Sequence, residues 1–229
     1  MAKRRRRAKA PRRKHKGKKK RFVRVRRREP FFYSKERQAE ILSSLTLAKA
    51  KEILAKHTTE AHLFVHAAAV SAAMGALAEH FGGDVEHWAA IGWLHDVDYE
   101  KYPDEHCRHV RELLAPEGVD EEDISSIISH GYGAVTDEKE PETDMEKSLF
   151  AVDELTGIVH AYALMRPEGM AGMEVKSLKK KFKDKRFAAK CDRELIQKGV
   201  ERLGLDLGVL MEYCIKGMQA HEAELDLGK

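Results

Sequence analysis

Apolar residues recur every three or four positions along most of this 229-residue chain. That spacing is typical of one face of a helix, whereas a half-buried strand alternates apolar and polar positions. We find no alternation of useful length anywhere in the sequence, so the pattern predicts an all-α fold. The predicted helices span residues 35–57 (as one helix or two short ones), 60–81, 85 to about 95, 106–114, 121–130, 145–165, 187–202 and 206–225.

Residues at the ends of these segments agree with the pattern. Thr58 or Thr59, and then Asp84, stand directly before periodic segments, where a short polar side chain accepts hydrogen bonds from the first turn of a helix. Gly82 and Gly204 follow periodic segments, and glycine is common where the backbone turns left-handed to leave a helix. These residues predict where the central helices begin and end.

The remaining segments divide the chain into parts. Residues 131–144 are polar and acidic, and residues 167–186 carry glycines and a cluster of lysines. We therefore predict three parts. They are a disordered basic tail over residues 1–30, a helical core over 31–165, and a C-terminal part over 166–229 whose basic loop and helices pack on the core.

Length and cysteine content limit the class of protein. The length suits one domain with appendages. Three widely spaced cysteines do not make a disulfide framework, and a reducing compartment is the default for such thiols. We find no uninterrupted apolar run of the ~18 residues that span a bilayer, and no apolar stretch behind the N-terminal charges that would make a signal peptide. We therefore expect a cytoplasmic protein without a membrane partner.

The net charge of +4 conceals two oppositely charged regions. Residues 1–29 hold roughly eighteen Lys and Arg against one acid, so the rest of the chain is acidic, at about −13. A low-complexity basic segment buries too little apolar surface to order itself, and its cations are suited to phosphate backbones. We predict contact with nucleic acid or another polyanion through residues 1–30, with a solubilising tail as the alternative.

The clearest candidate for chemistry is a polar pair at the end of an apolar run. Residues 91–94 lead directly into His95 and Asp96, and a buried polar pair is unfavourable without a partner. Imidazole and carboxylate together suit a divalent cation such as Mn, Fe, Ni, Mg or Zn. Neighbouring side chains on a helix diverge by about 100°, so both reach one ion only at a helix end. The pair therefore predicts a metal site whose other ligands come from elsewhere in the chain.

An isolated histidine, a His-Asp doublet and a distant aspartate resemble the signature of the HD-domain superfamily of metal-dependent phosphohydrolases. Here these residues are His66, His95-Asp96 and Asp153. Longer phrases are similar to one subgroup of bacterial HD hydrolases, and the resemblance covers about residues 36–200. The phrases are Leu94–Lys101, Ile128–Tyr132, Ala151–Gly157 and Ser177–Phe182.

The resemblance implies an HD-type helical bundle in which His66, His95, Asp96 and Asp153 bind the metal ion. For His66 the alternative is a core histidine, and His62, one turn earlier, competes for its role. The implied activity is metal-dependent hydrolysis of a small phosphate ester, most simply a nucleotide, with a phosphomonoester favoured over a phosphodiester. The alternative function is a non-catalytic HD module that binds nucleotide or RNA as a sensor or scaffold.

Two further histidines match positions where HD enzymes hold a second ion or bind substrate phosphate. These are His106 and His130, with His109 as a weaker alternative. A histidine at the end of a helix is also able to act purely structurally. The number of bound ions, one or two, is therefore left open by the sequence.

The remaining predicted site residues are acids and cations. We expect Asp98 and Glu154 to act beside Asp96 in catalysis, by orienting water or a ligand histidine, with plain surface acids as the alternative. A phosphate also needs cations, because the domain around it is acidic. We expect Lys101, Lys180 and Arg193 to contact substrate, and the alternative for the lysine cluster is a solvated basic face.

Overall fold

The computed structural model describes residues 45–227, and its elements are helical. The only bridge pairing in this range is an isolated one between Tyr132 and Thr136, so the all-α prediction is confirmed here. The predicted basic tail and the predicted helix over residues 35–44 lie outside the described residues. The α-helices are α2 (Leu47–His57), α3 (Ala61–Phe81), α4 (Val85–Leu94), α5 (Val110–Leu114), α6 (Glu121–Ile128), α7 (Asp144–Leu164), α8 (Val175–Lys183), α9 (Arg193–Leu203) and α10 (Leu207–Ala220).

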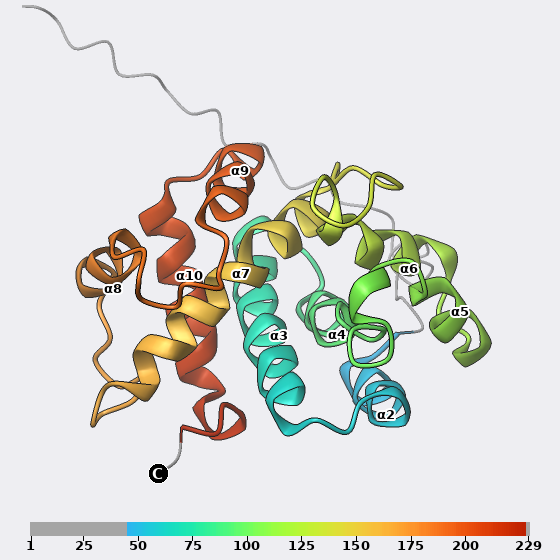
Figure 1. Ribbon diagram of the computed structural model, residues 1–229, viewed down its shortest axis with the longest axis horizontal. Helices are drawn as coiled ribbons and strands as arrows, with labels where there is room; N and C mark the ends of the chain where they lie inside the picture. The colour runs from blue at the N-terminus through green and yellow to red at the C-terminus, as the bar shows by residue number, and fades with distance from the viewer. Residues whose placement is uncertain (1–44, 228–229) are drawn as a thin grey trace, which may run out of the picture. The chain divides into compact units, whose positions relative to one another are not determined.

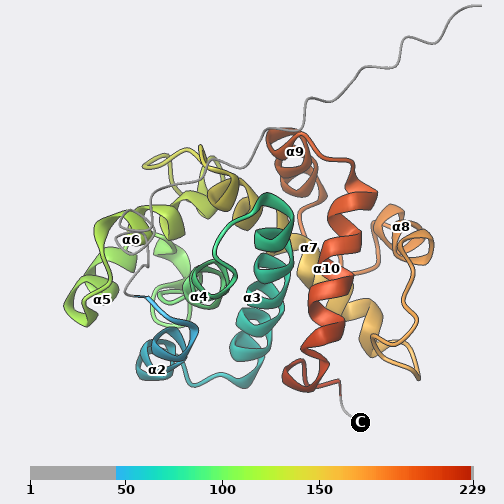
Figure 2. The same ribbon diagram turned by 180° about the vertical axis from the view of Figure 1, so that it is seen from behind.

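Helix α3 is the centre of the bundle. It packs against α4, α7 and α10, while α7 also contacts α9 and α8. Figures 1 and 2 place α2, α4, α5 and α6 on one side of α3 and α8, α9 and α10 on the other. Its middle is alanine-rich and buried on nearly every face, which is expected of a helix surrounded by other helices.

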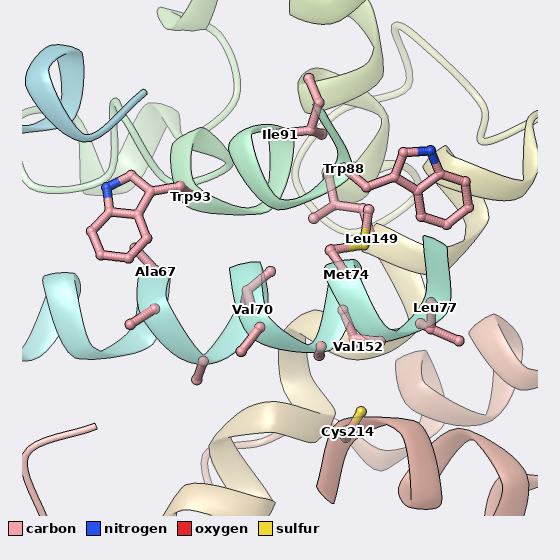
Figure 3. Packing of buried hydrophobic residues seen from close by; sticks show 14 of the residues in the cluster. Ala67, Val70, Met74, Leu77, Trp88, Ile91, Trp93, Leu149, Val152 and Cys214 are labelled. Atoms are coloured by element: carbon pink, nitrogen blue, oxygen red, sulfur yellow. The ribbon is translucent and has the colours of Figure 1, made fainter. Parts of the chain in front are cut away.

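The face of α3 toward α4 carries larger side chains. Val70, Met74 and Leu77 are fully buried. Figure 3 shows Trp93 of α4 over Ala67 and Trp88 over Leu77, with Met74 reaching toward α4 between the two tryptophans. Gly92 makes the approach of the two helices possible, because a Cβ at this position would lie 3.0 Å from the Cα of Ser71. The small residue therefore brings the C-terminal end of α4 against α3.

Several predicted helix ends are confirmed. Gly82 and Gly204 end their helices in the left-handed conformation, with φ of 73° and 66°. Asp84 caps α4 by accepting hydrogen bonds from the first turn. Helix α7 begins with a capping box between Thr143 and Glu146, an arrangement that satisfies two otherwise free backbone donors.

The predicted cap of α3 is wrong. The N-cap residue is Glu60, and neither Thr58 nor Thr59 caps the helix with its side chain. Instead the carboxylate of Glu100 accepts hydrogen bonds from the backbone N–H groups of Thr59 and Glu60. A carboxylate at a helix N-terminus is favourable because of the helix dipole, so a distant residue replaces the local cap.

Three helix predictions also need correction. Residues 187–192 are not helical, and α9 begins only at Arg193. Residues 106–109 are not helical, and α5 begins only at Val110. The lysine-rich stretch predicted as part of a loop is helix α8. Val175, Leu178 and Phe182 recur at helical spacing within it, and Leu178 is fully buried. The charge run therefore obscured an amphipathic helix in the sequence.

One helix of the described chain, α3, is long and apolar enough to cross a membrane by length and composition. Two thirds of its apolar window, 67%, is nevertheless buried inside the bundle. A core helix that is surrounded by other helices meets the same criterion of length and composition. Its apolar residues do not form an uninterrupted run in the sequence, because His62 and His66 lie among them.

Candidate metal centre

Three helices bring the four predicted ligands together. His66 lies in the second turn of α3 and Asp153 in the middle of α7. His95 and Asp96 follow directly after the last residue of α4. The chain turns there, so the two neighbouring side chains converge, as expected of a helix end.

The donor atoms of these residues form one compact group. The Nε2 atom of His66 lies 3.0 Å from Asp153 Oδ1 and 3.4 Å from Asp96 Oδ2. The Nε2 atom of His95 lies 3.2 Å from Asp96 Oδ2 and 3.4 Å from Asp153 Oδ1. The two Nε2 atoms are 3.1 Å apart. We call this group the first subsite.

These separations fit a shared ion. Metal–ligand bonds of about 2.0–2.2 Å at octahedral or tetrahedral angles place neighbouring donors roughly 2.8–3.6 Å apart. Every separation measured in the first subsite falls in this range. The first subsite is thus able to hold a metal ion.

The second oxygen of Asp96 faces two other histidines. Asp96 Oδ1 lies 3.2 Å from His106 Nε2 and 3.7 Å from His130 Nε2, and these nitrogens are 3.1 Å apart. The thiol of Cys107 completes a group with the two histidines, since their donor atoms all lie within 4.8 Å of one another. We call this group, with Asp96 Oδ1, the second subsite.

Hydrogen bonds at Nδ1 orient three of the four imidazoles. His95 donates to the carbonyl of Gly92 at 2.9 Å, and His130 donates to the carbonyl of Ile127 at 2.6 Å. His106 donates to the carboxylate of Asp98 at 2.8 Å. With Nδ1 as the donor, a neutral ring presents a lone pair at Nε2, which is how ligand histidines are usually held. In the second subsite two such lone pairs point at each other, an arrangement that needs a cation or a proton between them.

The electrostatics of the centre also favour a cation. Burial alone lowers the pKa of His95, but Asp96 and Asp153 outweigh it and raise that pKa to about 9. Against the opposing effect of burial, His95, His106 and His130 hold the pKa of Asp96 well below its usual range. Burial likewise opposes ionisation of Cys107, yet His130 and His106 lower the thiol pKa to about 7. The carboxylates are therefore ionised and attract positive charge.

The two histidines named as alternative ligands lie outside both subsites. The side chain of His62 is 73% exposed and its nearest acidic partner is Glu60. His109 stacks on Tyr102 and pairs with Glu105 and Glu112. The structure therefore gives neither of them a position from which to replace His66 or His106.

The two predicted catalytic acids beside Asp96 occupy different positions. Asp98 is fully buried, and its carboxylate accepts hydrogen bonds from His106 Nδ1 and from the backbone N–H of His109. Glu154 lies beside Asp153 and accepts from the backbone N–H of Asp192. Burial, followed by the charge of Asp153, raises the pKa of Glu154. Asp98 is thus fully engaged, whereas Glu154 lines an open cavity.

That cavity has a volume of about 320 Å³ and opens at the first subsite. A neighbouring cavity of about 460 Å³ shares His62, His66 and Gly157 with it. A separate cavity of about 410 Å³ between α2, α3, α4 and α10 contains none of the ligands of either subsite. The residues lining the first cavity are His62, Leu63, His66, Asp96, Tyr99, Asp153, Glu154, Gly157 and Cys191.

The cations predicted to contact substrate do not line this cavity. Lys101 contacts His57 Nδ1 at 2.9 Å, and Lys180 is exposed on α8. The guanidinium of Arg193 donates to five backbone carbonyl groups between Phe182 and Cys191. Arg193 therefore organises the segment between α8 and α9, and the predicted contacts of all three with substrate gain no support from their positions.

Sequence reasoning missed two residues of the centre. Tyr99 lines the cavity, with its ring edge-on to His106, and Cys107 belongs to the second subsite. The number and spacing of the cysteines argue against a disulfide framework but do not indicate a ligand role. The position of Cys107 directly after a candidate ligand histidine was the signal that could have identified it.

Comparisons of the chain with protein-family models, with curated proteins and with solved structures find no match. The buried histidines, aspartates and cysteine are able to hold a metal ion. The case for a metal centre is therefore the geometry of these side chains, together with the resemblance of the sequence phrases that carry them.

Proposed function

We propose that this chain is a metal-dependent phosphohydrolase of the HD type that acts on a small phosphate ester, most simply a nucleotide. The single observation that carries the proposal is the convergence of His66, His95, Asp96 and Asp153, with donor separations of 3.0–3.4 Å. Their types and order along the chain are those that the HD resemblance implies. The second oxygen of Asp96 faces a second set of donors, which supports a centre for two ions.

A divalent ion, when bound, supplies Lewis-acid polarisation of a phosphoryl oxygen and activation of water for attack. The protein supplies orientation and proton transfer. Asp98 is a positioning residue, because its carboxylate fixes His106 and does not line the cavity. Glu154 lines the cavity beside Asp153, so it is the carboxyl group placed to hold or release a proton near a leaving oxygen.

The cavities support a small substrate. The reacting phosphate would lie in the cavity at the first subsite, and the rest of the ester would extend into the adjoining cavity along α3 and α7. Their volumes are in the usual range for small-molecule sites, about 300–1,000 Å³. Within residues 45–227 no Lys or Arg lines either cavity, so among these residues recognition of the anion falls mainly to the metal centre itself.

The test is a panel of phosphomonoesters and phosphodiesters with the full-length protein, loaded separately with Mn, Fe and Zn. Wild type is compared with Asp96→Asn and with Asp104→Asn, a matched control whose carboxylate is exposed in the following segment. We expect turnover in wild type and in the control, and its loss in Asp96→Asn. Metal-loaded wild type that binds nucleotide or RNA but hydrolyses no ester of the panel would support a non-catalytic HD module instead.

A further inference from the structure

Cys107 has an unusual backbone conformation. Its φ is 69°, one of three positive values among the non-glycine residues described, and a residue with a Cβ adopts this region only when its surroundings impose it. The residue is also buried, with 1% of its surface exposed. The conformation directs the thiol inward at the residue directly after His106.

The thiol lies at the second subsite. Its Sγ atom is 3.8 Å from Nε2 of His130 and within 4.8 Å of a ring nitrogen of His106. Gly131 leaves room for the sulfur, because a Cβ at that position would lie 2.6 Å from Cys107 Sγ. A missing side chain on one side and a left-handed backbone on the other thus place the sulfur beside two imidazole nitrogens.

Other roles for this thiol fit the structure less well. It does not line the cavity at the first subsite, so a substrate has no access to it as a nucleophile. The three cysteines are free thiols, so it forms no disulfide. A buried thiol with two facing lone pairs beside it is the environment of a metal ligand.

We propose that Cys107 is a sulfur ligand of the second subsite, together with His106, His130 and Asp96 Oδ1, and that it makes this subsite selective for a thiophilic ion such as Zn. The inference rests on the metal centre proposed above. On binding, the S–H bond breaks, a metal–sulfur bond forms and the proton passes to solvent, with no change of oxidation state. The first subsite contains only nitrogen and oxygen donors, which suit Mn or Mg better than thiolate does.

The experiment is X-ray absorption at the zinc edge of full-length, zinc-loaded protein. We expect a sulfur shell at about 2.3 Å beside nitrogen and oxygen neighbours at about 2.0–2.2 Å. The sulfur shell should vanish in Cys107→Ser and persist in Cys214→Ala, whose thiol is buried in the core. A second readout is the near-ultraviolet thiolate-to-metal band on titration with Co, which should be lost only in Cys107→Ser.

Each outcome separates the two proposals. Zinc that is bound with nitrogen and oxygen neighbours alone in wild type overturns the role of Cys107 but leaves the metal centre in place. Failure of wild type to bind zinc or cobalt at all overturns the metal centre itself. Circular dichroism of metal-free Cys107→Ser shows whether the variant is folded. If it is not, the double variant Cys191→Ala/Cys214→Ala decides the question, because Cys107 is then the one thiol left of the three. A sulfur shell in that variant supports the proposal, and its absence overturns it.

Discussion

The two subsites share Asp96 but are built in different ways. The ligands of the first subsite come from the long helices α3 and α7 and from the end of α4, so they are as far apart in sequence as His66 and Asp153. The residues of the second subsite all lie between Asp96 and His130 in the sequence. His106 and Cys107 come from the loop before α5, and His130 comes from the 3-10 turn that follows α6. One depends on the packing of the whole bundle, and the other on local backbone conformation.

This difference has a physical consequence. An ion at the first subsite links α3 to α7, so its binding stabilises the folded bundle by mass action. An ion at the second subsite links shorter segments and depends on the orientation of His106 by Asp98. Variants that affect one subsite at a time therefore test whether the two are separate.

The largest effect is expected from Asp96→Asn, because this side chain belongs to both subsites. Loss of its charge should lower metal affinity and activity by more than the roughly 10–100-fold typical of changes to outer-shell partners. Metal content and kcat/KM measure the effect. Activity that survives with the affinity of one subsite intact would contradict the bridging role.

The pH dependence of stability should differ between metal-free and metal-loaded protein. The pKa of His95 is about 9 in the folded chain against 6.5 for the free side chain. A raised pKa means that the folded state holds the proton more tightly. The stability gained from His95 is therefore complete below pH 6.5 and is lost as the pH rises toward 9, by about 3 kcal/mol. His106 and His130, whose pKa values are also raised against the effect of burial, lose stability in the same direction over this range. Thermal melting of metal-free protein should show this loss.

Metal-loaded protein is the control, because a bound ion takes the place of the proton on His95 and should flatten the dependence over the same pH range. A metal-free protein whose melting temperature is constant from pH 6.5 to 9 would show that the histidines of the centre do not hold protons beside the carboxylates.

Asp98→Asn should affect the second subsite alone. The amide still fills the space, but it no longer provides a charged acceptor for Nδ1–H of His106. We expect about 10–100-fold weaker binding of one ion, with the affinity of the first subsite unchanged. Calorimetric titration with Zn measures both sites. Equal weakening of both ions would contradict the separation of the subsites.

The smallest effect is expected from Lys180→Ala. This lysine is exposed on α8 and does not line the cavity, and surface substitutions usually change free energies by less than about 0.5 kcal/mol. We expect KM to change by less than about twofold on that basis. Tyr99→Ala, which removes a cavity side chain, is the contrast and should raise KM more. A larger increase of KM in Lys180→Ala than in Tyr99→Ala would support the contact between Lys180 and substrate that the sequence predicts.

The same comparison explains what the sequence was able to predict. Helical periodicity predicted the limits of α3, α4 and α7, and the HD resemblance pointed to four residues on or beside them as candidate ligands. The structure brings these four together because the faces of long helices are fixed by the apolar pattern. Gly92 and its close approach to α3 were not predicted, because the importance of a small residue depends on its neighbour in space.

The second subsite was harder to predict because its backbone is irregular. Apolar spacing continues from Val110 back into residues 106–109, so periodicity extended the helix too far. In the structure His106 and the backbone of His109 are instead held by Asp98, and Cys107 takes a left-handed conformation. A tertiary hydrogen-bond acceptor thus outweighs local propensity, and no pattern of apolar residues indicates this.

Element analysis shows directly whether the convergent side chains hold divalent metal. Full-length wild type, Asp96→Asn and the control Asp104→Asn are dialysed against Mn, Fe or Zn, washed, and measured by mass spectrometry for metal per chain. We expect retained metal in wild type and in the control, and little in Asp96→Asn. Equal metal content in wild type and Asp96→Asn, or none in either, would contradict it.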